Sequence, residues 1–396
     1  MSHRTTRRTT RRTALAATAL LGAAAAACTA APRLPALPPP APPAPGGRAA
    51  PAARPFTLAA TGDVLPHASV IRAARADANG AGYDFRPMFA GVAPVISTAD
   101  LALCHMETVY GEDDGPFTGY PSFTSPPQIA DALRATGYDS CSTASNHTLD
   151  DGPEGIRRTL DHLDRVGVAH AGSARTAEEA TPTLLEAGGA RVAHLAYTYG
   201  TNGAPVPADR PWSVNLIDES RVLSDARAAR EAGADVVVVS LHWGTEWQTA
   251  PDRLQLTLGR ALTAATTDGR PDVDLVLGTH AHVPQAYEKV NGTWVVYGMG
   301  DQVAGAMVNH SGAHDPRGNE GTIARFTFTP PRTPGGRWEV TRAEFVPQWF
   351  DTAAHRVVDL NAAVASGNTA LAPVRDRITR VVLSRGAGAQ GLVRAP

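Results

Sequence analysis

A series of short apolar runs, each followed at once by polar side chains, limits the choice of fold more than any other feature. Two of these runs, "ADVVVVSLHWG" and "VDLVLGTHAH", are rich in β-branched residues. Continuous runs of this kind are typical of strands that are buried on both faces. Such strands alternate along the chain with glycine-bearing turns and amphipathic segments. This alternation predicts an α/β fold built in layers.

Two helices are predicted from their start and stop signals. The segment "PPQIADALRATG" reads as a helix that ends at Gly137. The segment "PEGIRRTLDHLDRVG" has Pro153 in its first turn and Gly167 at its end. The main domain should run from residue 56 to residue 350. Residues 351–396, which contain "LAPVRDRITRVVLSRG", should form a C-terminal helical tail.

The first 28 residues have the layout of a secretory signal peptide. An arginine-rich arm, with a resemblance to a twin-arginine signal in "TRRTAL", precedes an alanine-rich run that ends at Cys28. Small residues before Cys28 are similar to a lipoprotein cleavage site, with Ala25 in place of the usual leucine. We therefore expect a lipid anchor at Cys28 on the outer face of the cell membrane. The alternative is ordinary cleavage within the alanine run and secretion.

Residues 29–55 are rich in proline and alanine and should form an extended linker. Two further cysteines, Cys104 and Cys141, could pair in an exported protein. The alternative, which we favour from the sequence, is two buried thiols. The net charge of −2 and the pI of about 6.7 argue against nucleic acid as a partner.

Several polar residues stand just past the end of a predicted strand. Ligand sites in α/β sheets form outside the carboxyl ends of strands, so these residues should converge. Carboxylate, amide and imidazole groups together suit Zn²⁺, Mn²⁺ or Fe, and a two-metal site with a bridging carboxylate. The candidates are Asp63, Glu107, Asn146, His147, His242, His280 and His282.

Each of these residues also has a simpler interpretation. Asp63 could be a turn residue, Glu107 could lie at the surface, and Asn146 could cap the following helix. A single histidine is more often a core or surface residue than a ligand. However, the sequence "HAH" places His280 and His282 two residues apart, and such residues in an extended chain point the same way.

The motifs resemble those of a known family. "TGDVLPH", "ADLALCHMET", "LHWGTEW" and "GTHAHVPQAYEKVNGTWVVYGMGD" are similar to motifs of the bacterial capsule synthesis proteins, called CapA or poly-γ-glutamate synthesis proteins. The resemblance extends over residues 56–347. That family looks like a divergent branch of the calcineurin-like metallophosphoesterases. The resemblance implies a four-layer α/β/β/α sandwich with two divalent metal ions, Mn, Fe or Zn, at the strand ends.

The resemblance also implies roles for individual residues. Glu107 would bridge the two ions. Asp63, Glu107 and His282 would hold one ion. The other ion would be held by Glu107, Asn146, His242 and His280.

Some positions depart from the metallophosphoesterase pattern. Leu65 stands where a histidine is usual, and His67 is the nearest substitute as a metal ligand. His105 replaces an asparagine and is a possible extra ligand, and Asp301 also stands where asparagine is common.

The resemblance makes His147 the group that protonates the leaving oxygen or holds the substrate's developing charge. The acidic residue that usually follows this histidine is replaced by Thr148, so Asp150 should orient His147 instead.

These residues lead to an expected function. We expect an exported metal-dependent hydrolase or transferase that acts on an anionic cell-envelope polymer or its phosphorylated precursor. The alternative is a non-catalytic, metal-binding partner of a membrane polymer synthase. A third interpretation is a phosphoesterase that scavenges nucleotides outside the cell. The substrate should be selected by long loops such as "VYGEDDGPFTGYPSFTSP" and "TYGTNGAPVPADRPWS".

Overall fold

The structure is a computed structural model that describes residues 53–333 and 335–396. The expected signal peptide, the lipidation site at Cys28 and nearly all of the expected linker lie outside these residues. The first strand begins at Phe56, where the sequence predicts the start of the folded part. In the described ranges, no helix combines the length and the apolar character that a membrane span requires.

The larger of two main sheets has nine strands in the part of the chain that the structure describes. Its central strands β1, β2, β5 and β6 are parallel to one another, and β16 and β17 continue the sheet in antiparallel fashion. The strands are β1 (Phe56–Leu65), β2 (Leu101–Met106), β5 (Ser140–Ser142), β6 (Ala169–Ala171), β15 (Asp301–Ala304), β16 (Glu320–Thr329), β17 (Glu339–Asp351), β18 (Arg356–Asp359) and β19 (Leu392–Arg394).

The second main sheet has the strand order β13-β14-β12-β9-β8-β7, and its four inner strands are parallel. Its strands are β7 (Thr183–Ala187), β8 (Ala190–Thr198), β9 (Val236–His242), β12 (Leu275–Thr279), β13 (Tyr287–Val290) and β14 (Thr293–Val296). Two small two-stranded sheets are β3 (Val109–Tyr110) with β4 (Thr124–Ser125), and β10 (Thr266–Thr267) with β11 (Arg270–Pro271).

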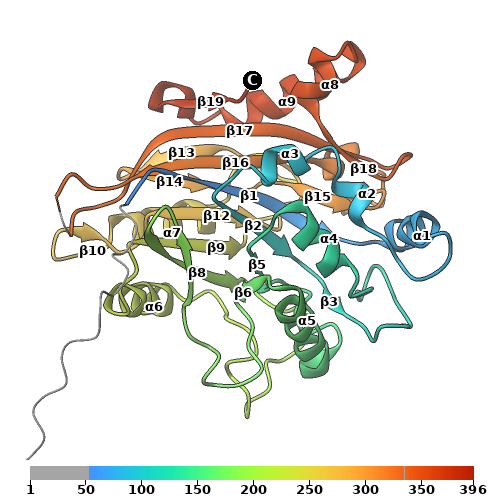
Figure 1. The fold of residues 1–396 in the computed structure, drawn as a ribbon, viewed down its shortest axis with the longest axis horizontal. Helices are drawn as coiled ribbons and strands as arrows, with labels where there is room; N and C mark the ends of the chain where they lie inside the picture. Colours follow the sequence, from blue (N-terminus) through green and yellow to red (C-terminus); the bar gives the residue numbers. More distant parts are fainter. Residues whose placement is uncertain (1–52, 334) are drawn as a thin grey trace, which may run out of the picture. The chain divides into compact units, whose positions relative to one another are not determined.

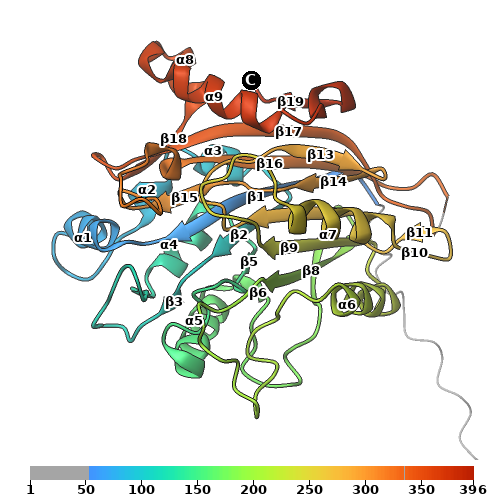
Figure 2. The ribbon, with the colours of Figure 1, turned by 180° about the vertical axis from the view of Figure 1, so that it is seen from behind.

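Helices cover the outer faces of both sheets, as Figures 1 and 2 show. The helices are α1 (Ala68–Asp77), α2 (Arg86–Phe89), α3 (Ala93–Ile96), α4 (Ile129–Thr136), α5 (Gly152–Val166), α6 (Glu219–Glu231), α7 (Arg253–Ala264), α8 (Leu360–Ala365) and α9 (Ala372–Val382). Short 3₁₀ helices span Pro316–Asn319, Thr369–Leu371 and Ala387–Gln390. The predicted ends of α4 and α5 are confirmed, because Gly137 and Gly167 adopt the left-handed conformation there.

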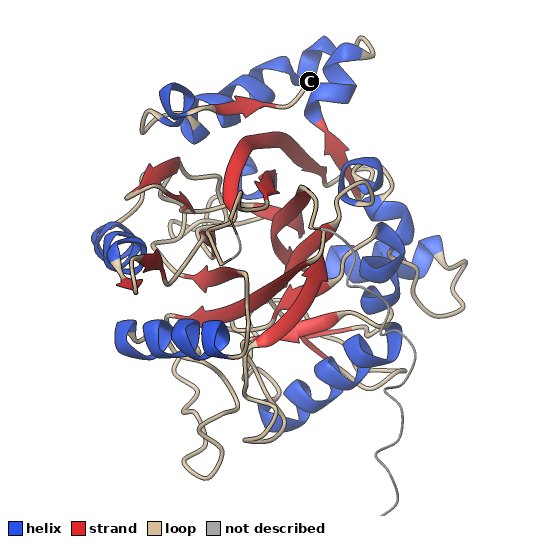
Figure 3. Ribbon diagram, turned by 60° about the vertical axis from the view of Figure 1, so that its left-hand side comes forward, coloured by secondary structure: helices blue, strands red, loops and turns tan. Residues whose placement is uncertain are grey.

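The alternation of side chains along the strands divides the core into layers. In β1, Leu58 and Ala60 pack between the two sheets, whereas Ala59 faces the helices α1–α5. In β9, Val238 packs between the sheets and Val239 faces α6 and α7. The expected four-layer α/β/β/α arrangement is therefore confirmed, with helices on either side of the strands (Figure 3).

The last 46 residues are more than a helical tail. They contain the expected helices, but β18 pairs with β17 and β19 pairs with β17 as well. Ile378 and Val382 of α9 are fully buried in the core that also holds Phe326 and Phe345. Figure 1 shows α8 and α9 lying over β17. Short strands of this kind carry little sequence signal, since pairing with β17 defines them.

Cys104 and Cys141 form a disulfide, so our preference for two free thiols was wrong. The two residues lie directly opposite each other on the neighbouring parallel strands β2 and β5, with their Cα atoms 4.4 Å apart. Register between strands is a long-range property, and this register brings the two sulfur atoms together. The bridge joins the strands that carry His105 and Ser142.

Gly62 marks a close approach between β1 and the turn before β15. A Cβ atom at Gly62 would lie 1.7 Å from the carbonyl oxygen of Gly300. We predict that Gly62→Ala lowers the free energy of unfolding by about 1–3 kcal/mol, because the backbone must move apart. Urea unfolding followed by circular dichroism measures this change.

The matched control is Gly259→Ala in α7. A Cβ atom there meets its nearest neighbour at 3.6 Å, which is ordinary contact. Alanine also favours a helix by up to about 1 kcal/mol relative to glycine. Equal destabilisation by both substitutions would contradict the close approach at Gly62.

Candidate metal centre

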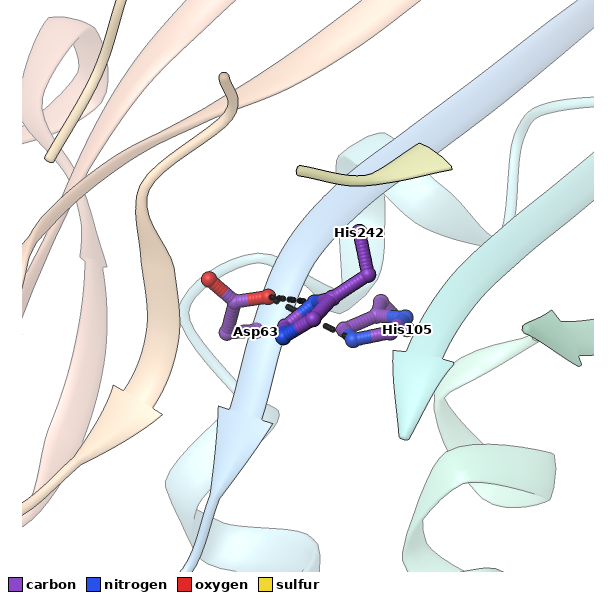
Figure 4. A group of neighbouring side chains, drawn as sticks. All are labelled: Asp63, His105 and His242. Atoms are coloured by element: carbon purple, nitrogen blue, oxygen red, sulfur yellow. Dashed lines mark ion pairs between the residues drawn. The ribbon is translucent and has the colours of Figure 1, made fainter. Parts of the chain in front are cut away.

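Asp63 lies at the centre of a cluster of imidazole and carboxylate groups. Its Oδ1 atom lies 3.6 Å from Nε2 of His105 in β2 and 3.9 Å from Nδ1 of His242 at the end of β9 (Figure 4). The rings of His105 and His242 stack with their centroids 4.7 Å apart. The larger sheet supplies Asp63 and His105, and the second sheet supplies His242. The site therefore forms where the two sheets meet.

A second group of possible ligands shares the same aspartate. Nδ1 of His282 lies 3.9 Å from Oδ2 of Asp63 and 2.9 Å from Oδ1 of Asp301. Asp63 is not just past a strand end, as the sequence suggests, but within β1, opposite His105 and Asp301. A register shift in β1 just before Asp63 is consistent with the turn of its carboxylate toward both sets of ligands.

His280 and His282 both reach the centre, but not by the expected route. They do not lie in an extended chain, because their φ angles are +92° and +58°. The left-handed region is uncommon for residues other than glycine. The backbone N–H of His280 donates to the Asp63 carboxylate at 3.2 Å from Oδ2, which holds the turn in place. Backbone strain of this kind often occurs at functional sites.

Glu107 and Asn146 also lie in the cluster, as predicted. Nε2 of His242 lies 2.9 Å from Oδ1 of Asn146 and 3.8 Å from Oε1 of Glu107. Asp63 is the carboxylate shared by two compact groups of possible ligand atoms in the described part of the chain, and the bridging role of Glu107 stays a prediction.

His147 is held by Asp150, as the sequence predicts. Nδ1 of His147 lies 2.7 Å from Oδ2 of Asp150, which also accepts the backbone N–H of Phe123 at 2.6 Å. The Nδ1–H tautomer satisfies this contact and leaves Nε2 for other partners. The residue is 6% exposed, and its ring packs edge-on against Phe123.

His67 is not brought into any of the compact ligand groups in the described part of the chain. Its Nδ1 atom accepts the backbone N–H of Gly305 at 3.0 Å, and its ring packs edge-on against Phe123. Burial lowers the pKa of His67 to about 4. His67 therefore acts as a neutral packing residue at the start of α1.

Sequence reasoning missed Glu246 as a possible ligand. This residue lies in the motif "LHWGTEW", whose resemblance to the family was noted, but no strand ends there. In the structure, its carboxylate lies beside His280 and His282. The signal in the sequence was the motif itself, in which Glu246 stands four residues after the candidate ligand His242.

The cluster contains buried polar atoms that have no hydrogen-bond partner. Ionised groups buried in this way cost several kcal/mol unless a charge of opposite sign compensates them. Divalent cations bind such carboxylate oxygens and imidazole nitrogens. The residues therefore fit a metal centre. The atoms are both carboxylate oxygens of Glu107, Nε2 of His105, Nδ1 of His280 and Oδ2 of Asp301.

The pKa values of the cluster also fit a metal centre. Burial, and then the neighbouring Glu107 and Asp301, raise the pKa of Asp63 well above 3.8. Burial also raises the pKa of Glu107 to about 7 and lowers the pKa of His242 and His280 well below 6.5. Neutral imidazoles are the form that binds metal.

His282 behaves differently from the other histidines. Burial favours its neutral form, but the carboxylates around it, Asp301 first, outweigh burial and raise the pKa of His282 well above 6.5. The carboxylates thus attract positive charge to this place, which a proton or a metal ion can supply.

These observations define the class of the protein. It is a layered α/β protein with a candidate metal centre where its two main sheets meet. Residues 57–306 match the family described as bacterial capsule synthesis protein PGA_cap. This match spans more than half of the 396 residues, and the chain belongs to that family.

Two curated relatives carry related names. The chain is 26% identical over 176 residues to "Capsule biosynthesis protein CapA" of Bacillus anthracis, covering 43% of this chain and 41% of that protein. It is 26% identical over 173 residues to "PGA biosynthesis protein CapA" of Bacillus subtilis, covering 43% and 44%. The matches span less than half the length of these relatives.

Among solved structures, the chain is similar to the crystal structure of the calcineurin-like phosphoesterase YfkN from Bacillus subtilis. The TM-score is 0.43 with 15% sequence identity, covering 82% of this chain and 99% of the chain compared.

The buried carboxylate of Asp63 leads to a prediction about stability. We predict that Mn²⁺ or Zn²⁺ raises the melting temperature of the chelator-treated protein. An ion present at 100 times its Kd increases the free energy of unfolding by about 2.7 kcal/mol. Asp63→Asn should abolish this gain. Without metal, however, Asp63→Asn should melt at or above the wild-type temperature, because it removes an uncompensated buried charge.

Differential scanning calorimetry with and without metal measures both effects. Asp77→Asn is the control, since Asp77 pairs with Arg356 away from the cluster. A melting temperature that no ion changes in the wild-type protein would exclude a metal centre at Asp63.

Proposed function

We propose that this protein is a metal-dependent hydrolase or transferase that acts on a phosphorylated precursor of a cell-envelope polymer, or on the polymer itself. The hydrogen bond between His147 and Asp150 beside the ligand cluster is the observation that supports this proposal most directly. A purely structural metal site has no need of an oriented imidazole beside it. Membership of the capsule synthesis family supports the polymer as the context.

The proposal assigns the metal ions to the groups described above. Two divalent ions, of the Mn, Fe or Zn class, would be held by a set of carboxylates, imidazoles and one amide. When bound, they would polarise a phosphoryl oxygen and lower the pKa of water. The set comprises Asp63, His105, Glu107, Asn146, His242, His280, His282 and Asp301.

In this mechanism His147 is the general acid. Asp150 accepts the Nδ1–H bond and fixes the ring. In its doubly protonated form the ring then gives its Nε2 proton to the leaving oxygen and returns to the neutral Nδ1–H form. The backbone N–H of His147 donates to Oγ of Ser145, which in turn donates to the backbone carbonyl of Glu107. His147 is thereby tied to the strand end that carries a ligand.

One observation favours the alternative of a non-catalytic partner. Each of the main ligand side chains is nearly inaccessible: Asp63 is 0% exposed, Glu107 1% and His242 1%. A metal bound only by such residues would brace the two sheets or, in a complex, help to bind an anionic polymer beside a membrane synthase. The test below separates the two functions.

We predict that His147→Ala lowers turnover of a phosphoester such as p-nitrophenyl phosphate by about 10²–10⁴-fold, the usual contribution of a general acid. Metal content and melting temperature should stay near those of the wild-type protein, because the ring is not assigned as a ligand. Asp150→Asn should reduce turnover and alter its pH profile, since it acts through His147. Steady-state rates and elemental analysis measure these effects.

His314→Ala, at an exposed position, is the matched control. The decisive comparison is polymer output in cells. If His147→Ala retains full output while Glu107→Ala abolishes it, metal binding matters without proton transfer. The protein would then be a binding partner rather than an enzyme.

We also propose that the protein is exported and anchored by lipid at Cys28. The support is the order of arginine arm, alanine run, Cys28 and proline-rich linker in the sequence. The disulfide between Cys104 and Cys141 agrees with an oxidising compartment.

We predict that Cys28→Ala moves the protein from the membrane fraction into the medium. Fractionation and immunoblotting detect the shift, and mass spectrometry of the mature N-terminus identifies the lipid. A mature N-terminus at another alanine, without lipid, would exclude the anchor and leave secretion.

A further inference from the structure

The loop between β9 and α7, residues 243–252, carries an acidic residue that the proposed function does not use. This residue is Glu246. One carboxylate oxygen of Glu246 and one ring nitrogen from each of His280 and His282 all lie within 4.8 Å of one another. This grouping does not include Asp63. It shares His282 with the group of Asp63 and Asp301 and lies at the edge of the metal centre.

Backbone contacts fix the conformation of the loop and therefore the position of Glu246. The backbone N–H of Trp247 donates to the carbonyl of Ala281, which lies between the two histidines, at 2.9 Å. Trp247 adopts a φ of +68°, an uncommon conformation for a residue with a side chain. Three neighbouring residues, Trp247, His280 and His282, thus share this backbone strain.

Further contacts fix the loop beyond Glu246. Oγ1 of Thr245 donates to Oδ2 of Asp252 at 2.9 Å, and Asp252 caps the start of α7. The side-chain amide of Gln285 donates to the carbonyl of Gln248 at 2.8 Å. A rigid loop that holds a carboxylate against two imidazoles is the arrangement that metal ligation requires.

A second, independent observation comes from His280. Its side chain is buried, with 3% of the residue exposed, and its Nδ1 atom has no hydrogen-bond partner. Buried ring nitrogens normally have a partner, because leaving one unpaired costs about 1–3 kcal/mol. A ligand that accepts the lone pair of a neutral imidazole would satisfy this atom.

An ion pair with His310 is a simpler explanation for Glu246. Nε2 of His310 lies 3.6 Å from Oε2 of Glu246, and the His310 side chain is 69% exposed. Exposed pairs contribute little, about 0–1 kcal/mol. Such a pair explains neither the strained turn nor the unpartnered Nδ1 of His280.

We propose that Glu246 is a metal ligand and that, with His280 and His282, it holds the outer of the two proposed divalent cations. One carboxylate and two imidazoles suit the same Zn, Mn or Fe class as the inner residues. The inference rests on the proposed metal centre and extends it to a loop outside the two sheets.

The outer position differs from the inner one in access to solvent. The side chain of Glu246 is 29% exposed, whereas that of Asp63 is 0% exposed. An ion held by Glu246 should therefore exchange with solvent faster than an ion held by Asp63. Removal of metal by a chelator should proceed in two phases.

The test is titration of the chelator-stripped protein with Zn²⁺ or Mn²⁺ by isothermal titration calorimetry, with bound metal counted by elemental analysis. We expect Glu246→Gln to weaken the binding of one ion by at least about tenfold. This figure is conservative, since even residues that only hydrogen-bond to the ligands contribute about 10–100-fold to metal affinity. The fast phase of chelation should disappear while the slow phase remains. Glu246→Asp, which keeps a carboxylate, should lose less affinity than Glu246→Gln.

Two controls separate ligation from the ion pair. His310→Ala removes the exposed ring that lies beside Glu246 and should leave metal affinity unchanged. Glu154→Gln makes the same chemical change in a pair with Arg157 on α5 and should also have no effect. Visible absorption of the Co²⁺-loaded protein should change with Glu246→Gln alone, because the spectrum reports the ligands.

The outcomes are distinct. If the wild-type protein binds no ion, the proposed metal centre fails. If it binds ions and Glu246→Gln binds them equally well, with one phase of chelation, Glu246 is not a ligand and the proposed function stands. If His310→Ala weakens binding as much as Glu246→Gln does, the role of Glu246 as a ligand is excluded.

Discussion

The carboxylate of Asp63 is the group around which the site is built. It lies on the central strand of the larger sheet with 0% of its side chain exposed. His105 approaches it from the neighbouring strand, and His242 approaches it from the second sheet. An ionised carboxylate in such a place is costly unless positive charge compensates it. The packing of the two sheets buries this carboxylate, and its burial in turn requires a cation to compensate its charge.

Close backbone approaches within each sheet lie beside the candidate ligands. A Cβ atom at Gly62 would lie 1.7 Å from the carbonyl oxygen of Gly300, and one at Gly278 would lie 2.0 Å from that of Tyr297. Gly62 directly precedes the candidate ligand Asp63, and Gly278 lies two residues before the candidate ligand His280. The disulfide between Cys104 and Cys141 ties together the strands on the other side of Asp63. Backbone contacts and a covalent bond thus hold the centre from both directions.

Much of the fold could be predicted from local signals. The glycines that end α4 and α5, the runs that form β9 and β12, and the start at Phe56 all depend on neighbouring residues in the sequence. The contributions of β18 and β19 could not be predicted, because both strands exist through pairing with β17. The sequence left the disulfide open as one of two alternatives for the same reason, since strand register sets the distance between its cysteines.

For the site, the sequence by itself determined which residue types were available and that they would gather at one edge, because parallel strands end together. Only the tertiary structure decided how they group. The left-handed turns at His280 and His282 replaced the expected extended chain, and a loop brought Glu246 beside them. The direction of a side chain depends on local backbone angles and on the meeting of two sheets. Contacts between residues more than two hundred positions apart, such as Asp63 and His280, set both.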